Sequence, residues 1–120
     1  MDLILWRHAE AEDADAGELD LQRPLTSRGE RQAERMAEWL NRRLVHSTRI
    51  LVSPALRCQQ TVKALGRKSR TIATIGPGAG PEDVIASVRW PKASGPMLVV
   101  GHQPALGMVR YVQVHRLDTD

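Results

Sequence analysis

Residues 3–8, Leu-Ile-Leu-Trp-Arg-His, decide how the rest of the chain is interpreted. Four apolar residues in a row, without helical periodicity, predict a short buried strand. The predicted strand spans residues 3–7 and is followed directly by His8, so Arg7 and His8 present a cation and an imidazole at one edge of a sheet. By itself such a pair is weak evidence for a functional site, and other segments of the chain have to supply further residues of that site.

Two further apolar segments predict buried strands that end in similar residues. Arg49–Ser53 is stopped by Pro54, and Met97–Gly101 is followed directly by His102. Thr71–Ile75 predicts a weaker strand, on its β-branched residues alone. The segment that starts at residue 104 fits either a helix or a strand, since its apolar residues suit both periods.

Between these strands, apolar residues recur at helical spacing. Ser27 and Glu30 have the spacing of a capping box, with Thr26 as the alternative cap. The sequence predicts helices over residues 26–44 and 54–66, and a short one from residue 81. Alternation of buried strands and helices predicts an α/β fold with a mostly parallel central sheet flanked by helices on both faces.

Length and composition limit the remaining possibilities. With 120 residues, 42% of them hydrophobic, we expect residues 1–120 to form a single domain. The net charge of +3 suits an anionic partner, but acids are interspersed among the bases, so no nucleic acid is expected. No apolar stretch reaches the ~20 residues of a membrane span. The lone Cys58 excludes an internal disulfide and predicts a cytoplasmic location.

Residues 9–24 form an acidic segment that contains Gly17 and ends in Pro24. Its composition predicts a long exposed loop. For its six acidic residues, solvation is the favoured interpretation.

The polar strand ends predict one site. In an open parallel sheet, ligands bind beyond the carboxyl ends of the strands. These ends carry Arg7 with His8, Ser53 with Arg57 one helical turn later, and His102. Two arginines and two histidines favour a compact anion, with phosphate as the leading candidate, because guanidinium groups bond phosphate oxygens bidentately.

The same residues predict covalent chemistry. Neighbouring arginines lower the pKa of a histidine, which leaves a ring nitrogen free to attack phosphorus. A second histidine can stabilise the phosphoryl oxygens in the transition state. We expect no metal and no cofactor, because side chains already supply the positive charge.

Four short motifs then occur in order along residues 7 to 104, and together they resemble the histidine phosphatase superfamily, in particular its short SixA-type phosphohistidine phosphatases. The motifs are Arg7-His8-Ala9; Arg23-Pro24-Leu25-Thr26 with Gly29; Ser53-Pro54 with Arg57, Gln60 and Thr61; and Gly101-His102 with Pro104. The resemblance implies a minimal phosphoglycerate mutase-like fold without a cap domain.

The resemblance also implies roles for single residues. His8 would be the nucleophile that carries the phosphoryl group, and Arg7, Arg57 and His102 would bind phosphate as part of the catalytic set. Arg23 would lie at the rim of the phosphate pocket. Ser53 is expected as a helix cap or as a hydrogen-bonding partner within the substrate site. The implied activity is a metal-independent hydrolase acting on phosphohistidine in a phosphotransfer protein, in signal transduction.

Three departures from the family pattern bear on activity. Position 9 is Ala where the wider superfamily favours Gly. The only acids between Arg57 and His102 are Glu82 and Asp83, whose place at a helix start favours a capping role over that of a general acid. Only residues 103–120 follow His102, whereas the family pattern continues with another helix and strand. One interpretation is a C-terminally shortened domain.

Other functions stay open on the sequence. One is a general phosphomonoesterase acting on a small phosphorylated metabolite. Another is a catalytically inactive phosphate-binding or protein-interaction module. A cysteine phosphatase is disfavoured, because Cys58 lacks the arginine six positions later that this chemistry requires: position 64 is Ala.

Overall fold

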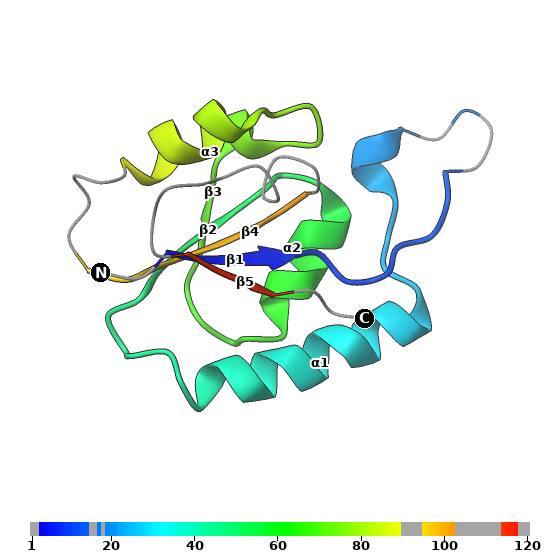
Figure 1. Ribbon diagram of the computed structural model, residues 1–120. Helices are drawn as coiled ribbons and strands as arrows, with labels where there is room; N and C mark the ends of the chain where they lie inside the picture. Colours follow the sequence, from blue (N-terminus) through cyan, green and yellow to red (C-terminus); the bar gives the residue numbers. More distant parts are fainter. Residues whose placement is uncertain (1–2, 15–16, 18, 90–94, 103–113, 118–120) are drawn as a thin grey trace.

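The computed structural model describes residues 3–14, 17, 19–89, 95–102 and 114–117, and its centre is a parallel β-sheet (Figure 1). All four strand pairings in this five-stranded sheet are parallel. The strand order is β3-β2-β4-β1-β5. The strands are β1 (Leu3–Arg7), β2 (Arg49–Val52), β3 (Arg70–Thr71), β4 (Met97–Gly101) and β5 (Val114–Leu117).

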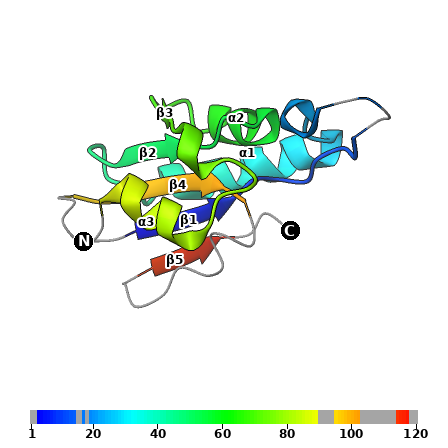
Figure 2. The ribbon, with the colours of Figure 1, turned by 90° about the horizontal axis from the view of Figure 1, so that it is seen from above.

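Helices cover both faces of the sheet, as Figures 1 and 2 show. The helical elements are η1 (Asp20–Gln22), α1 (Ser27–Asn41), α2 (Leu56–Lys63), η2 (Ala73–Ile75) and α3 (Pro81–Val88). Trp6 of β1 packs in a core with residues of α1 and α2. Leu3 and Leu5 face the opposite way and pack in a second core with residues of η2 and α3. The predicted α/β architecture is therefore confirmed, because successive side chains of a buried strand serve two separate cores.

The register brings three strand ends to one edge of the sheet. Arg7 of β1 lies beside Gly101 of β4, and Val52 of β2 lies beside Val100. The ladder continues one residue further, since the backbone N–H of His8 donates to Gly101 O at 3.1 Å. Residues 8, 53 and 102 therefore follow their strands at the same end.

The predicted strand at residues 71–75 is wrong beyond its first residue. Only Arg70 and Thr71 pair with β2, and Ala73–Ile75 form the 3-10 helix η2. Burial explains the change, because Ile75 is 2% exposed in the core beneath α3. The chain has to turn toward that core, and β-branched composition could not reveal this.

The boundaries of the first two helices also differ from the sequence prediction. Thr26 caps α1, accepting a hydrogen bond from Gly29 N at 2.9 Å, so the predicted box between Ser27 and Glu30 does not form. α1 ends at Asn41, and α2 is confined to Leu56–Lys63. β2 ends at Val52, one residue early.

For the segment that starts at residue 104, the sequence fitted either a helix or a strand. Its residues 114–117 are strand β5, paired in parallel with β1. Residues 103–113, including the predicted motif residue Pro104, lie outside the described residues. Among the helices that are described, none is both long and apolar enough to cross a membrane.

We expect Gly29→Ala to destabilise the fold strongly. A Cβ at Gly29 would lie 2.0 Å from the backbone oxygen of Glu10, so the segment after β1 would have to move away from α1. Overpacking of this kind costs about 1–3 kcal/mol. Urea denaturation should report the loss, with Gly78→Ala as the control, since a Cβ there meets nothing within 4 Å. Equal stability of the two variants would contradict the expectation.

Candidate active site

The predicted site residues converge at the carboxyl ends of β1, β2 and β4. Arg7 is the last residue of β1, and His8 follows it. Ser53 follows β2, and its backbone N–H donates to Val100 O at 3.0 Å. His102 follows β4, and its ring lies edge-on to that of His8, with 5.3 Å between the ring centroids. Arg57 enters from the first turn of α2.

His8 is held with one ring nitrogen engaged. Its Nδ1 lies 2.8 Å from the backbone oxygen of Ala9, which can only accept a hydrogen bond, so Nδ1 carries the proton. Ala9 is itself fixed by Thr61, whose Oγ1 accepts from Ala9 N at 3.1 Å and donates to Arg57 O at 2.7 Å. In the neutral ring the lone pair therefore resides on Nε2.

The pKa of His8 lies below its usual 6.5. Partial burial is the main cause, and the charges of Arg57, Arg7 and Arg23 act in the same direction. The hydrogen bond to Ala9 opposes them without reversing the shift. His8 is consequently neutral at neutral pH, with an unprotonated Nε2.

His102 is buried and tied to Ser53. Its Nε2 lies 2.7 Å from Ser53 Oγ, which also accepts a hydrogen bond from Ala55 N at 3.2 Å. Burial, followed by the charges of Arg57 and His8, lowers the pKa of His102 to about 4. Ser53 is fully buried, so it acts on the site by orienting the ring of His102.

Arg57 is almost completely buried and its guanidinium group meets Asp20 of η1. Nη1 donates to the backbone oxygen of Asp20 at 2.8 Å, and Nη2 donates to Asp20 Oδ2 at 3.0 Å. Asp20 Oδ1 accepts from Arg23 Nη1 at 3.0 Å. The two arginine hydrogen bonds, with Arg23 first, lower the pKa of Asp20, which therefore remains a carboxylate.

Asp20 is the residue that the sequence analysis missed. We expected the acids of residues 9–24 to be solvated, and the Asp20 side chain is indeed 51% exposed. Its hydrogen-bonded ion pairs with Arg23 and Arg57 were not expected. The available signal was its position three residues before Arg23, which places both on one side of a helical turn. Arg23 is positioned further by a hydrogen bond from its Nε to Glu12 O at 2.7 Å.

Comparison with known proteins now adds a second line of evidence. The family model described as "histidine phosphatase superfamily (branch 1)" matches residues 3–78, which is more than half of the chain. This chain belongs to the histidine phosphatase superfamily. The match contains three of the four motifs that carry the resemblance in the sequence.

The similar proteins place the chain in the SixA-type branch of the superfamily. The phosphohistidine phosphatase SixA of Escherichia coli is 41% identical over 66 residues, which are 55% of this chain and 40% of that protein. A structure from Nakamurella multipartitia, described as a candidate SixA, is 36% identical with a TM-score of 0.73, over 86% of this chain and 59% of that one. A SixA structure complexed with tungstate is 29% identical with a TM-score of 0.74, over 87% and 71% of the two chains.

Cys58 and Asp83, which the sequence raised as alternative functional residues, have structural roles in this member of the superfamily. Cys58 is completely buried, and burial raises the pKa of its thiol to about 12, so it is not a thiolate nucleophile. Asp83 accepts a hydrogen bond from Gly80 N at 2.9 Å and caps α3, as expected. Glu82 lies in the same first turn of α3, the helix that covers the face of the sheet opposite α1 and α2.

We expect this histidine phosphatase to lose stability below pH 6.5, partly through His102. Unfolded His102 takes up a proton near pH 6.5, whereas folded His102 stays neutral down to about pH 4. The contribution of His102 to the free energy of unfolding is therefore fully present above pH 6.5. It declines as the pH falls from 6.5 to about 4, by up to about 1.4 kcal/mol per pH unit for one proton. Urea denaturation of the wild type and His102→Asn, at several pH values, should show a weaker pH dependence in the variant. Identical pH dependence would contradict the assignment.

Proposed function

We propose that this chain is a metal-independent phosphatase that removes phosphate from phosphohistidine in a phosphotransfer protein, through a covalent phospho-His8 intermediate. The observation that carries the proposal is the state of His8: its Nδ1–H is held by Ala9 O, and its pKa is lowered. An unprotonated Nε2 is thus available beside Arg57 and His102. Because the chain spans 40% and 59% of two of the SixA relatives, this activity is inferred from the residues present.

The reaction would proceed in two displacements at phosphorus. The lone pair of His8 Nε2 forms a bond to phosphorus, while the P–N bond of the substrate breaks and its electron pair returns to the departing imidazole. Water then attacks phospho-His8, the bond to Nε2 breaks, and orthophosphate leaves. Arg7, Arg57 and His102 would hold the phosphoryl oxygens, a role comparable to oxyanion binding in other enzymes. The structure of a SixA relative in complex with tungstate, a tetrahedral oxyanion, supports binding of such an anion by this chain.

The charge state of Asp20 favours phosphohistidine over an alkyl phosphate ester. An alkoxide leaving group needs a proton donor, and Asp20, which contacts two site arginines, is held as a carboxylate. Imidazole leaves as a neutral molecule when its other nitrogen carries a proton. A substrate with P–N chemistry therefore suits the described part of the site without a general acid.

Exposed leucines around the site favour a protein substrate over a small metabolite. Leu19 and Leu21 flank Asp20 and are 63% and 46% exposed. Leu56, directly before Arg57, is 37% exposed, and its helix α2 contacts η1. Apolar side chains grouped on a surface are typical of protein interaction sites. We place this phosphatase in the cytoplasm, where phosphotransfer proteins and a reduced Cys58 are both expected.

We expect Leu21→Ser to raise KM for a phosphorylated phosphotransfer domain about three- to tenfold, with little change on p-nitrophenyl phosphate. Leu21 is exposed, so it adds binding only where the partner is large enough to cover it. Val45→Ser is the control, because Val45 is 55% exposed in the connection between α1 and β2. Equal losses on both substrates would argue against a protein surface at η1.

The direct test is orthophosphate release from a phosphohistidine-bearing phosphotransfer domain in the presence of a chelator. The same protein is assayed on p-nitrophenyl phosphate and on an alkyl phosphate monoester. Chelator-resistant release that is fastest on phosphohistidine supports the proposal. Faster turnover of the alkyl ester would favour a general phosphomonoesterase, and no release from folded protein would favour a phosphate-binding module.

A further inference from the structure

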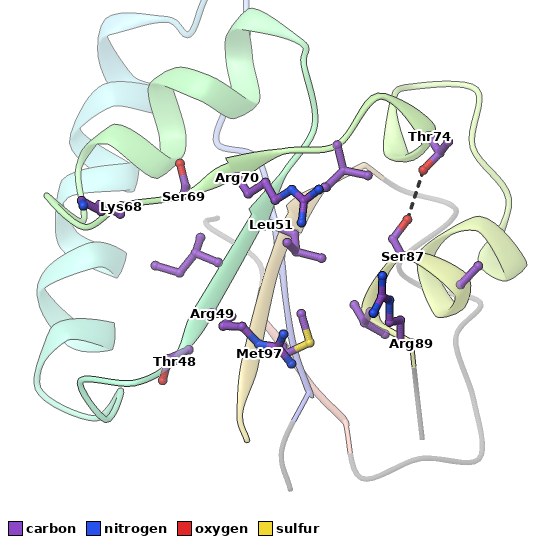
Figure 3. A pocket seen from close by; sticks show the side chains of 14 residues that line it. Thr48, Arg49, Leu51, Lys68, Ser69, Arg70, Thr74, Ser87, Arg89 and Met97 are labelled. Atoms are coloured by element: carbon purple, nitrogen blue, oxygen red, sulfur yellow. Dashed lines mark hydrogen bonds between the residues drawn. The ribbon is translucent and has the colours of Figure 1, made fainter. Parts of the chain in front are cut away.

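A cavity of about 700 Å³ lies between strands β2 and β3 and helix α3, away from the candidate active site (Figure 3). Its apolar lining includes Leu51, Val88 and Met97, all of which are buried. None of the proposed catalytic residues lines it. The cavity therefore needs an explanation that is independent of phosphoryl transfer. We call it the arginine cavity, after the lining residues Arg49, Arg70 and Arg89.

Three separate elements bring these arginines together. Arg49 begins β2, Arg70 begins the edge strand β3, and Arg89 follows α3. Figure 3 shows their side chains directed into the space between the strands and α3. Lys68 also lines the cavity, and its described lining residues include no Asp or Glu. The described lining therefore combines positively charged and apolar side chains.

Within the described residues, the side chains of Arg70 and Arg89 form no ion pair. Arg49 has a further interaction of its own, so Arg70 and Arg89 are the guanidinium groups considered for a ligand. Cations that face one another repel, and an anion placed between them removes that repulsion. Arginine is also the side chain that binds phosphate or carboxylate bidentately.

The backbone of Arg89 adds an independent observation. Its φ of 55° and ψ of 31° lie in the left-handed region, which glycine adopts most readily at the end of a helix. The chain places an arginine there instead, and this arginine lines the cavity. Strained backbone of this kind is concentrated at binding sites.

We propose that the arginine cavity binds a small organic polyphosphate that carries an aromatic or apolar body, such as a nucleoside triphosphate. The phosphates would lie on Arg70 and Arg89, with the body on the apolar lining. The volume falls within the range of small-molecule sites. Hydroxyl groups at the margin, where Thr74 and Ser87 are hydrogen-bonded at 3.1 Å, suit a polar ring such as ribose. The site is separate from the phosphohistidine pocket, so both can be occupied together.

Isothermal titration calorimetry of the full chain with adenosine triphosphate tests this proposal. A chelator excludes metal, and saturating tungstate occupies the candidate active site. The wild type should bind adenosine triphosphate more tightly than adenosine or inorganic triphosphate. Adenosine lacks the phosphates that would contact the arginines, and inorganic triphosphate lacks the body that would contact the apolar lining. The double variant with Arg70→Ser and Arg89→Gly should weaken binding at least about tenfold, through the loss of two charge-assisted contacts.

The control carries Arg31→Ser and Arg35→Ser, which remove the same charge from the exposed surface of α1. Its affinity should stay within about twofold of the wild type. The single variant Arg89→Gly removes the backbone strain at position 89, because glycine adopts the left-handed conformation readily. It can replace the double variant in the titration if the double variant does not fold. Equal weakening in the control, displacement by tungstate, or no binding at millimolar concentration would overturn the proposal. Binding of a glutamate-rich peptide in place of all three small probes would also overturn it.

Discussion

His8→Ala is expected to lower orthophosphate release by a factor of at least about 10⁴, because it removes the group proposed to carry the phosphoryl in the first displacement. The backbone around His8 is held independently, by the bonds from His8 N to Gly101 O and from Ala9 N to Thr61 Oγ1. The variant should therefore fold. Release from a phosphohistidine-bearing domain, measured with a chelator, gives the rate.

Labelling of the enzyme distinguishes loss of the nucleophile from loss of binding. Rapid quenching of the wild type with labelled substrate should trap a phosphoenzyme that is acid-labile and alkali-stable, as expected for phosphohistidine. The label should be missing in His8→Ala and present in His46→Ala, which alters an exposed histidine in the connection between α1 and β2. A label that persists in His8→Ala would show that another residue is the nucleophile.

Arg57→Ala is expected to lower kcat/KM by about 10²–10³, the usual consequence of removing one donor to a developing oxyanion. Arg57 is 4% exposed, so its charge acts in a poorly hydrated site, unlike that of a surface arginine. Arg57→Lys should recover little, because the point charge of lysine does not reproduce the planar fork that meets Asp20 through two atoms. Steady-state kinetics on phosphohistidine gives both values.

Lys63→Ala is the matched control for Arg57→Ala. It removes one positive charge from the same helix, α2, at an exposed position in its last turn. Its kcat/KM should stay within about twofold of the wild type. A comparable loss in Lys63→Ala would mean that net charge, and not the position of the guanidinium group, controls the reaction. Thermal unfolding of each variant separates lost chemistry from lost structure.

Most of the fold could be predicted because it depends on local pattern. The strands at residues 3–7 and 97–101 were predicted with the boundaries that the structure has. Continuous apolar runs of this length are most simply explained as buried strands of a parallel sheet when helices separate them along the chain. The convergence of Arg7, His8, Ser53, Arg57 and His102 was predictable for a related reason, since parallel strands place their carboxyl ends at one edge.

The strand predicted at residues 71–75 and the missed partner of Asp20 both concern places where a distant segment decides the local structure. Residues 73–75 turn into η2 because Ile75 is buried under α3, and strand propensity carries no information about that core. Asp20 is half-exposed, as expected for one of six acids in an acidic segment, but its ion pair with Arg57 was missed. Its actual partner Arg57 lies 37 residues away, so the ion pair exists only once η1 packs on α2.

The α/β class and the set of residues in the candidate active site follow from the residues alone, because apolar period and strand-end chemistry are local properties. Tertiary structure decides the state of that site: which nitrogen of His8 is free, how far burial lowers the pKa of His102, and that Asp20 holds Arg57. It also creates the arginine cavity, whose three arginines are scattered along the chain. Desolvation and long-range charge pairing depend on what surrounds a group in space, and neighbouring residues in the sequence do not specify those surroundings.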